Sequence, residues 1–289
     1  MARVLIVGCG DIGLGLARTL LAEGHAVTAV KRNPLTEAVA GLAIVLADVS
    51  NPASIKGLPT GFDQIFVILT PGQRNEESYR AVYEKGLANL LDYFAAHRGG
   101  QQSRSPHWIF VSSSSVYGQH AGEWVDESSP TEPRGFNGHV LLEAERKLWQ
   151  AGAGNTVVRF SGIYGPGRRR FVDRVRSEKP VQYQPPYYTN RIHRDDCVAV
   201  LAWLFRQRLA GKVLDSLYLA SDSEPAPLAE VATWLAAKTG CSSPPALADS
   251  ISAAQNKRCS NRKLLTQGYQ FLFNNYREGY GALLDRGEE

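Results

Sequence analysis

Short apolar runs alternate with stretches of helical spacing along the first part of the chain. The first run, Ala2–Val7, is rich in β-branched residues and predicts a buried strand. The next stretch, Leu14–Glu23, has helical spacing and ends before Gly24, a residue that suits a helix C-terminus. Strands that alternate with helices indicate an α/β fold with a doubly wound parallel sheet. The same pattern predicts further strands at His25–Val30, Ala43–Leu46, Gln64–Leu69, Trp108–Val111 and Thr156–Phe160.

Longer periodic stretches predict further helices. Apolar and aromatic side chains recur on one face from Tyr79 to Phe94, which we interpret as a core-facing helix and not as a cofactor-binding stretch. His139–Trp149 is also helical, and the apolar spacing of residues 228–235 predicts another core-facing helix. A polar, glycine-containing loop is expected over residues 98–106.

A glycine-rich turn joins the first predicted strand to the first predicted helix. Residues 8–13 read G-C-G-D-I-G, which matches the pattern G-x-G-x-x-G. Gly8 allows a tight turn, Gly10 lets the backbone approach a pyrophosphate, and Gly13 lets the helix pack closely on the strand. The helix N-terminus offers N–H groups and partial positive charge to phosphates. In this strand–turn–helix context the motif predicts a dinucleotide-binding site.

The end of the second predicted strand bears on the choice of cofactor. A carboxylate there would bind the ribose 2′-hydroxyl of NAD, whereas a basic residue suits the 2′-phosphate of NADP. Lys31 and Arg32 therefore favour NADP, with NAD as the second choice; a solvated strand end is the alternative interpretation. Asp48 follows the third strand, where its carboxylate can accept a hydrogen bond from the adenine amino group. The predicted cofactor contacts in this part of the chain are Gly8, Gly10, Asp11, Ile12, Gly13, Lys31, Arg32, Asp48, Val49, Leu69, Thr70 and Pro71.

The bulk composition limits the class of protein. Of 289 residues, 44% are hydrophobic and 21% charged, as in an ordinary globular protein. A net charge of +4 without a long basic run argues against nucleic acid as a partner, and no apolar stretch is long enough to span a bilayer. A buried strand at residue 2 leaves no room for a signal peptide. The four cysteines lack C-x-x-C spacing, which indicates reduced thiols in a cytoplasmic protein without a metal site.

Polar stretches later in the chain are candidate ligand contacts. Residues 112–118 read S-S-S-S-V-Y-G after a predicted strand, and hydroxyls at the carboxyl end of a sheet strand face the ligand-binding crevice. Five arginines between residues 168 and 176 can clamp phosphates through forked hydrogen bonds, or form a solvated helix face. Residues 182–191 are rich in aromatic and amide side chains, which suits a sugar or planar ligand, a packed loop or a subunit contact.

Several segments together resemble the NAD-dependent epimerase/dehydratase group of the extended short-chain dehydrogenase/reductase superfamily. They are the glycine turn, residues 112–118, Arg159 with Y-G-P-G-R at 164–168, I-H-R-D-D at 192–196, K-R-C-S-N at 257–261 and Y-R-E-G at 276–279. The resemblance implies a Rossmann domain over residues 1–165 and a smaller substrate lobe over 166–289, of which about 192–220 packs back onto the Rossmann domain. By analogy with the group it also implies a homodimer.

The resemblance implies roles for individual residues as well. Ser113 would hydrogen-bond the reacting oxygen of a small-molecule substrate, and Tyr164 would line the nicotinamide end of the cofactor cleft. His193, in the I-H-R-D-D segment, is expected to be structural. Substrate contacts are assigned to Ser114, Ser115, Arg168, Tyr183 and Arg191.

The usual catalytic pair of this group is missing at its expected place. Members carry Tyr-x-x-x-Lys at the start of the helix after the serine strand, where the tyrosine exchanges a proton and the lysine lowers the pKa of that tyrosine. The matching positions here are Asn137 and Leu141, and neither side chain can do this work. His139 on the same helix and Tyr117 near Ser113 are candidate substitutes; a surface histidine and a structural tyrosine are the alternatives.

Two hypotheses about function follow. An enzyme would transfer a hydride between NADP(H) or NAD(H) and a carbonyl or alcohol carbon of a nucleotide-sugar-like substrate, as an epimerase, dehydratase or reductase. A non-catalytic protein would sense NADP(H) or a metabolite through the same cleft, as the atypical branch of the superfamily suggests. The resemblance favours the enzyme, whereas the missing tyrosine and lysine favour the sensor.

Overall fold

The chain divides into two units in the computed structural model, which describes residues 1–97, 105–248 and 255–287. The first unit holds residues 1–116, 135–159 and 198–218, and the second holds 117–134, 160–197 and 219–289. Most of the loop predicted over residues 98–106 lies outside the described residues. The predicted domain boundary after residue 165 stays a prediction, since the units divide the chain at several places.

A seven-stranded sheet runs through the first unit. Its strands are β1 (Arg3–Val7), β2 (Ala26–Lys31), β3 (Ala43–Leu46), β4 (Gln64–Val67), β5 (His107–Ser113), β7 (Thr156–Phe160) and β11 (Leu217–Ala220). They follow the order β11-β7-β5-β4-β1-β2-β3, and the neighbouring strands from β5 to β3 pair in parallel.

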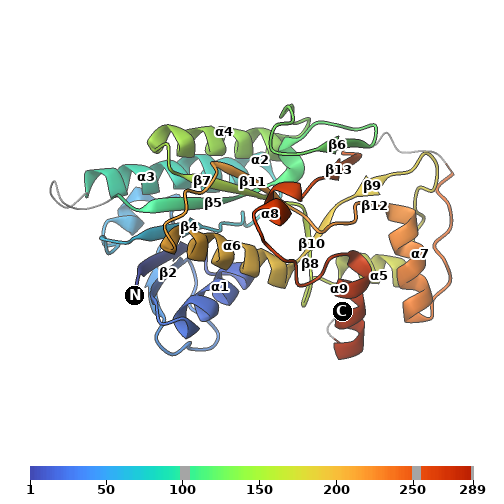
Figure 1. Cartoon of the computed structure of the whole chain (residues 1–289), viewed down its shortest axis with the longest axis horizontal. Coiled ribbons are helices and arrows are strands. Elements are labelled where there is room, and N and C mark those ends of the chain that lie inside the picture. Colours follow the sequence, from blue (N-terminus) through green and yellow to red (C-terminus); the bar gives the residue numbers. More distant parts are fainter. Residues whose placement is uncertain (98–104, 249–254, 288–289) are drawn as a thin grey trace. The chain divides into compact units, whose positions relative to one another are not determined.

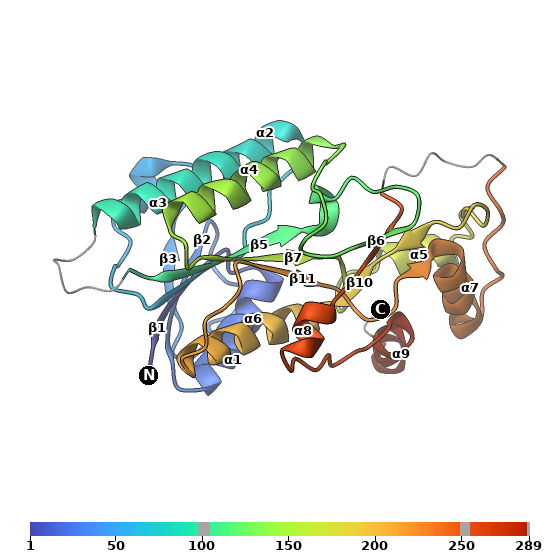
Figure 2. The ribbon, with the colours of Figure 1, turned by 45° about the horizontal axis from the view of Figure 1, so that its top comes forward.

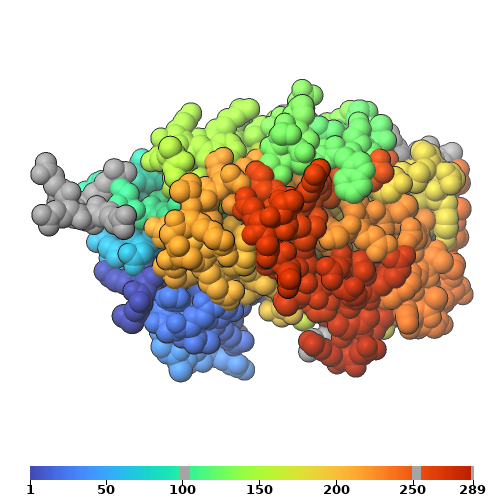
Figure 3. Space-filling view, viewed as in Figure 1, coloured from blue at the N-terminus to red at the C-terminus, as the bar shows by residue number. Residues whose placement is uncertain are grey.

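Helices cover both faces of this sheet. They are α1 (Asp11–Ala22), α2 (Glu76–Tyr79), α3 (Leu87–Ala96), α4 (Phe136–Ala151) and α6 (Arg194–Leu209). Helices α2, α3 and α4 lie on one face, and α1 and α6 lie on the other (Figure 1 and Figure 2). Figure 3 shows the outer sides of α1, in blue, and α6, in gold, at the surface. The arrangement confirms the predicted doubly wound α/β fold.

Burial depends on the position of each strand in the sheet. Residues Val4–Val7 of β1 and all of β4 are buried, because strands with neighbours on both sides and helices on both faces see no solvent. Strand β3 was predicted from the same kind of apolar run but is the last strand, and its Ile44 and Leu46 are 36% and 54% exposed. An apolar run therefore locates a strand without showing whether it is central.

The helix predicted from Tyr79 to Phe94 is longer and less regular than expected. Asn75 caps its start by accepting a hydrogen bond from the Ser78 N–H at 2.9 Å, and helical structure continues to the end of α3. Between α2 and α3 the segment η2 (Arg80–Gly86) is π-helical, a rare form that is often found at functional sites. A Cβ on Gly86 would lie 2.7 Å from Val49 Cγ2, so this helix approaches the sheet edge closely.

A buried ion pair joins three elements of the first unit. Glu145 of α4 is fully buried, and Arg159 of β7 is nearly so. Arg159 donates from Nε to Oε1 at 2.9 Å and from Nη2 to Oε2 at 2.5 Å. The Ser112 hydroxyl of β5 donates to Oε1 at 2.5 Å. Both charges are thus paired and hydrogen-bonded, the condition under which a protein interior tolerates ions.

His107, at the start of β5, is held without a charge. Its Nδ1 lies 3.1 Å from Gln64 Oε1, and its Nε2 lies 3.3 Å from Thr156 Oγ1. Burial, with a smaller effect of the positive charge of Arg208, lowers the pKa of His107 from 6.5 to about 4. The folded protein therefore binds a proton at this position less readily than the unfolded chain does.

We expect this histidine to weaken the fold in acid. Because the pKa of His107 is lower in the folded protein than in the unfolded chain, the unfolded chain takes up the proton first as the pH falls. The stability that the neutral side chain contributes is therefore complete above about pH 6.5 and is lost as the pH falls toward 4. Between pH 7 and pH 5 the loss should be about 2 kcal/mol. Urea unfolding at both pH values should show this part of the loss absent in His107→Gln and retained in His139→Gln. An unchanged pH dependence in His107→Gln would contradict the assignment.

The second unit combines short strand pairs with helices around an apolar core. Buried residues of three helices share this core with Tyr164 and Val181. The helix predicted over 228–235 lies there, with Val231 and Leu235 fully buried. The strand pairs are β8 (Gly162–Tyr164) with β10 (Arg191–His193), β9 (Tyr188–Thr189) with β12 (Ala226–Pro227), and β6 (Glu123–Val125) with β13 (Lys257–Cys259). The helices are α5 (Arg170–Arg176), α7 (Leu228–Thr239), α8 (Arg262–Thr266) and α9 (Tyr276–Arg286).

Candidate functional site

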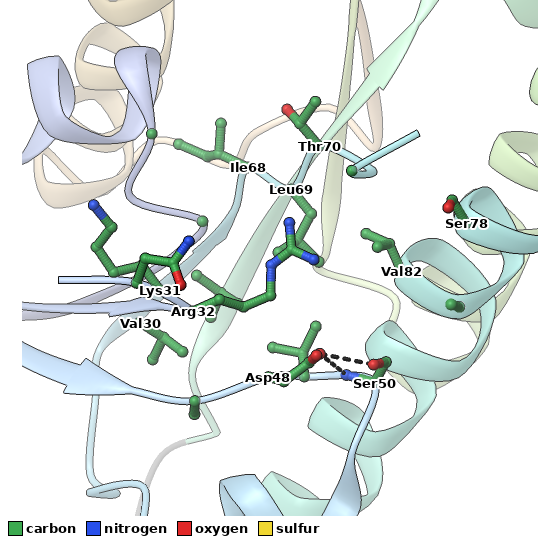
Figure 4. A pocket seen from close by; sticks show the side chains of 18 of the residues that line it. Val30, Lys31, Arg32, Asp48, Ser50, Ile68, Leu69, Thr70, Ser78 and Val82 are labelled. Atoms are coloured by element: carbon green, nitrogen blue, oxygen red, sulfur yellow. Dashed lines mark hydrogen bonds between the residues drawn. The ribbon is translucent and has the colours of Figure 1, made fainter. Parts of the chain in front are cut away.

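A pocket of about 690 Å³ opens where the carboxyl ends of β1, β2, β3 and β4 meet in the first unit (Figure 4). Residues that follow these strands line it, together with residues of α2 and η2. Ligands of open α/β sheets bind in this place, outside the carboxyl ends of the strands. Of the predicted cofactor contacts, the pocket brings together Gly8, Gly10, Lys31, Arg32, Asp48, Val49, Leu69 and Thr70.

The three glycines of the turn differ in what surrounds them. Gly8 has a φ of 98°, and a Cβ there would lie 2.1 Å from the Ile68 carbonyl oxygen. A Cβ on Gly13 would lie 2.3 Å from the Gly8 carbonyl oxygen. A Cβ on Gly10, in contrast, would meet no atom of the described residues within 4 Å. The packing of the chain explains Gly8 and Gly13 but leaves Gly10 facing open space, which is what the close approach of a phosphate requires.

Helix α1 begins at Asp11, three residues earlier than predicted, with Gly10 as its N-cap. Glycine has no side chain that could accept hydrogen bonds from the first turn, so an anionic ligand can do so instead. The predicted contacts Asp11, Ile12 and Gly13 form that turn. Together with Pro71, they are not among the described residues that line the pocket.

Lys31 and Arg32 are adjacent but point in different directions. The Lys31 ammonium group donates to the Pro34 carbonyl at 3.3 Å and points away from the middle of the pocket, whereas the Arg32 guanidinium points into it (Figure 4). The Arg32 Nη atoms would lie 3.8 Å from a Cβ on Gly72, so this side chain reaches toward the segment after β4. Lys31 is the last residue of β2, whereas Arg32 follows the strand in a bend, so the two side chains leave the backbone at different points of the chain.

Asp48 provides the acceptor at this end of the pocket. Its Oδ1 accepts from the Ser50 hydroxyl at 2.7 Å and from the Ser50 N–H at 2.9 Å (Figure 4). The hydroxyl hydrogen bond, with a smaller contribution from the charge of Arg32, holds the pKa of Asp48 below its usual value. Asp48 is therefore an ionised acceptor at neutral pH, suited to an amino group such as that of adenine.

One wall of the pocket comes from residues to which the sequence analysis assigned no cofactor role. Val82 belongs to the Tyr79–Phe94 stretch that was predicted to face the core and not a cofactor, yet it lines the pocket. The start of this helical segment could have been predicted, because Asn75 is a favoured N-cap residue and is followed by Glu76 and Glu77 in the first turn. The wall also includes Gln73, Ser78, Ala81 and Val82, and Ser50 lies beside Asp48.

Two side chains from this helical segment fix the sheet edge beside the pocket. The Tyr83 hydroxyl of η2 donates to the Leu69 carbonyl at 2.9 Å. The Asn89 amide of α3 donates to the Val49 carbonyl at 2.9 Å. The predicted contacts Leu69 and Val49 are thus held in place by hydrogen bonds from the facing helix.

The residues of this pocket fit a nicotinamide dinucleotide. Open space at Gly10 and the first turn of α1 suit a pyrophosphate. The Asp48 carboxylate suits adenine, and the guanidinium of Arg32 suits an anionic group on the ribose. The volume of about 690 Å³ lies within the range of cofactor sites.

The predicted serines lie at the end of β5 and in the short turn η3 (Ser114–Val116). The Ser113 hydroxyl accepts a hydrogen bond from the Ser115 N–H at 3.2 Å, which leaves its own proton available to a ligand. The Ser115 hydroxyl is buried and has no hydrogen-bond partner among the residues that the structure describes. Ser114 begins the turn between them.

The positions of the missing catalytic pair lie in the first turns of α4. Leu141 is 3% exposed, so the position expected for a lysine is a core position in this chain. Asn137 is half-buried. His139 is exposed, and its backbone N–H donates to the Gly135 carbonyl at 3.2 Å as part of the helix start.

Tyr117 and Tyr164 belong to the second unit. Tyr117 is buried, and its hydroxyl donates to the Asp126 carbonyl at 2.8 Å, which gives its proton an internal acceptor. Tyr164 is buried against Tyr280, and its hydroxyl would lie 1.8 Å from a Cβ on Gly279. Burial raises the pKa of Tyr164 well above its usual value.

The remaining predicted substrate contacts also lie in the second unit. Arg191 is buried, and its guanidinium lies 5.6 Å from the Phe171 ring centre and 5.8 Å from that of Tyr276. The Tyr183 hydroxyl donates to the Pro244 carbonyl at 2.9 Å, and Arg168 is exposed. The roles assigned to Ser113, His139, Tyr117, Tyr164 and these residues stay predictions.

Known proteins resemble this chain in both sequence and fold. The model of the NAD-dependent epimerase/dehydratase family matches residues 4–211. A Methylobacillus flagellatus protein classed with the NAD-dependent epimerase/dehydratases is 37% identical, with a TM-score of 0.84 over 100% of this chain and 99% of that chain. Protein YeeZ of Escherichia coli K12 is 27% identical over 74% of this chain and 76% of its own length. The UDP-glucose 4-epimerase of Thermus thermophilus, solved with NAD, is 20% identical and shares the fold, with a TM-score of 0.77 over 99% and 100% of the two chains.

Proposed function

The chain belongs to the NAD-dependent epimerase/dehydratase family, and we propose that its first unit binds NADP(H) in preference to NAD(H) to transform a carbonyl or alcohol group of a small molecule. One observation carries the proposal: Gly10 faces open space in a pocket into which Arg32 points. The alternative interpretation, that Lys31 and Arg32 form only a solvated strand end, gives no reason for the Arg32 guanidinium to point into this pocket.

Each part of the pocket has a task in this proposal. The first turn of α1 and the backbone at Gly10 hold the pyrophosphate, Asp48 accepts a hydrogen bond from the adenine amino group, and Arg32 forms forked hydrogen bonds with the 2′-phosphate. The nicotinamide, when bound, supplies hydride transfer. Ser113 donates a hydrogen bond to the reacting oxygen of the substrate, keeps its own proton, and so orients that oxygen.

A non-catalytic NADP(H) sensor is the second candidate, and the burial of Leu141 favours it. Leucine carries no charge, so residue 141 cannot lower the pKa of a catalytic tyrosine, and its side chain, 3% exposed, is packed as a core residue. The half-buried Asn137 cannot exchange a proton near neutral pH. The sensor would use the same pocket and would release its cofactor unchanged.

The Arg32 orientation leads to a test of cofactor choice. We expect Arg32→Ser to weaken NADPH binding about 10- to 100-fold, the equivalent of losing charge-assisted hydrogen bonds, and NADH binding less than about threefold. Lys31→Ser is the matched control, because its ammonium group already binds the Pro34 carbonyl; it should change both affinities less than about threefold. Fluorescence titration with each nucleotide measures these effects.

Equal losses of NADPH and NADH affinity in Arg32→Ser would contradict the 2′-phosphate assignment. A wild-type protein that binds neither nucleotide would overturn the proposal itself. Where NADPH binds, product formation separates the enzyme from the sensor. A reductase oxidises NADPH in the presence of ketones or aldehydes, whereas an epimerase or dehydratase regenerates its cofactor and is detected by the product it forms from a nucleotide sugar.

The substrate class to test first is a nucleotide sugar, because the UDP-glucose 4-epimerase from Thermus thermophilus shares the fold of this chain.

The proposal also covers the assembly and the location of the protein. The described residues include no helix with the length and apolar character of a membrane span. We further propose that the protein is cytoplasmic and forms a homodimer. Light scattering of the purified chain tests the dimer, and fractionation of cells that express the protein tests its location.

A further inference from the structure

The strand at one end of the sheet in the first unit has an open outer edge. β3 pairs with β2 on one side, and no strand among the described residues pairs with its other side. Every second residue of β3 therefore points its backbone N–H and C=O groups outward, where they can pair with a further strand. The strand at the opposite end of the sheet differs, because all of Leu217–Ala220 in β11 is buried.

Apolar side chains accompany this open edge. Ile44 and Leu46 are both exposed, and they share one face of the strand, because side chains two residues apart point the same way. None of residues 33–46 is buried, and Glu37 is the one charged residue among them. Edge strands are usually protected from pairing by lysine, proline or a covering segment. Residues 43–46 contain neither lysine nor proline, so the β3 edge lacks this protection.

The absence of charge in β3 indicates which partner its edge accepts. In a contact between two copies about a twofold axis, each residue meets residues of its own segment, so a charged edge would repel itself. An uncharged edge can pair with itself, whereas a contact with a different protein commonly matches opposite charges. Because a second copy presents the same single edge, the pairing closes at two chains.

The outer side of helix α4 in the same unit has a different character. Its exposed residues are His139, Glu143, Arg146 and Gln150, which form a polar stripe at helical spacing. The core of a dimer interface is depleted of charged residues. The β3 edge therefore suits such a core better than this helix does.

We propose that two copies of this chain pair through their β3 edges in antiparallel orientation, so that the sheets of the two first units join. A twofold axis perpendicular to the sheet reverses the direction of the strand but keeps each face of the sheet on its own side. The side chains at positions 44 and 46 of the two copies therefore meet on one face. The inference rests on the homodimer proposed above and names its contact surface.

Sedimentation of the full chain over a range of concentrations tests this surface. We expect a micromolar dissociation constant, because β3 and the adjoining connection supply fewer than the roughly 20–30 residues a side of a standard interface. The double variant Ile44→Lys/Leu46→Lys should weaken the dimer about 100-fold or more, since it opposes like charges across the axis. Ile44→Glu/Leu46→Glu should weaken it to the same extent for the same reason.

An equal mixture of the two double variants is the decisive sample. The positive charges of one variant then face the negative charges of the other, so the dimer should return with an affinity within about tenfold of wild type. Neither position 44 nor position 46 is buried, so both variants should fold, and circular dichroism checks this.

Leu209→Lys/Val213→Lys is the matched control. Leu209 and Val213 are exposed apolar residues of the same unit that do not belong to β3, and the double variant adds the same charge. It should leave the dimer dissociation constant within about threefold of wild type. A loss as large as that of the β3 variants would overturn the proposal.

The remaining outcomes separate the edge contact from the proposed function. A dimer that persists in both β3 variants, or a mixture of them that stays monomeric, would overturn the edge contact and leave the homodimer in place. A monomeric wild type would reject both. Residues 43–46 are not among the described residues that line the pocket in the first unit, so NADPH titration of wild type tests the cofactor site separately. Failure to bind NADPH would reject that site without affecting the dimer result.

Discussion

Gly10→Ala is expected to reduce NADPH affinity on the order of 100-fold, equivalent to about 3 kcal/mol, without destabilising the protein. A methyl group at this position would occupy the space through which the pyrophosphate approaches the backbone. The unfolding free energy should stay constant or rise by up to about 1 kcal/mol, because alanine restricts the unfolded chain. Gly10 has φ −86° and ψ −151°, which alanine can adopt, and a Cβ would contact none of the described residues.

Gly8→Ala is the control, because Gly8 is needed for the packing of the chain itself, whereas Gly10 is proposed to be needed for ligand binding. Gly8 has a φ of 98°, and a Cβ there would lie 2.1 Å from the Ile68 carbonyl oxygen. An alanine at this position would therefore push the glycine turn away from the segment that follows β4. We expect Gly8→Ala to lose several kcal/mol of stability, roughly the upper range of single substitutions. Urea unfolding and NADPH titration of both variants make the comparison. Wild-type NADPH affinity in Gly10→Ala would place the pyrophosphate elsewhere.

Arg159→Met should destabilise the protein by about 3–5 kcal/mol, because it leaves the fully buried Glu145 carboxylate without its counter-ion. The Ser112 hydroxyl alone cannot replace the two hydrogen bonds that the guanidinium donates. Urea unfolding of the whole chain at neutral pH measures the loss.

Arg80→Met is the matched control for the buried pair. Arg80 forms salt bridges with Glu76, Glu84 and Glu143, but its side chain is 40% exposed. Exposed pairs of this kind contribute about 0–1 kcal/mol. If Arg159→Met lost no more stability than Arg80→Met, the pair would not be the internal support that its burial indicates.

Local pattern was enough to predict the sheet and the glycine turn. The apolar run of β1, the turn and the following helix carry their signals within a few consecutive residues, so the strand–turn–helix unit and the doubly wound fold could be predicted. The start of α1 was placed three residues late, since Gly13 was interpreted as part of the turn and not of the helix.

The parts that local pattern could not predict depend on distant neighbours. Exposure of β3 follows from its place at the sheet edge, which no feature of Ala43–Leu46 reveals. Ser78 and Val82 line the pocket because η2 passes close to Val49, a contact made possible by Gly86. Lys31 and Arg32 have the same role in the sequence analysis, whereas only the Arg32 side chain, which follows the end of β2, points into the pocket.

The burial of Leu141 limits how the usual catalytic pair could be built into this chain. A lysine introduced at position 141 would have to place its ammonium group in a space that now packs a leucine side chain. Because an isolated ammonium group in a dry interior is strongly unfavourable, that substitution would destabilise the fold even if a tyrosine were placed at position 137. An engineered proton-transfer group is therefore better placed around the half-buried Ser113 than at position 141.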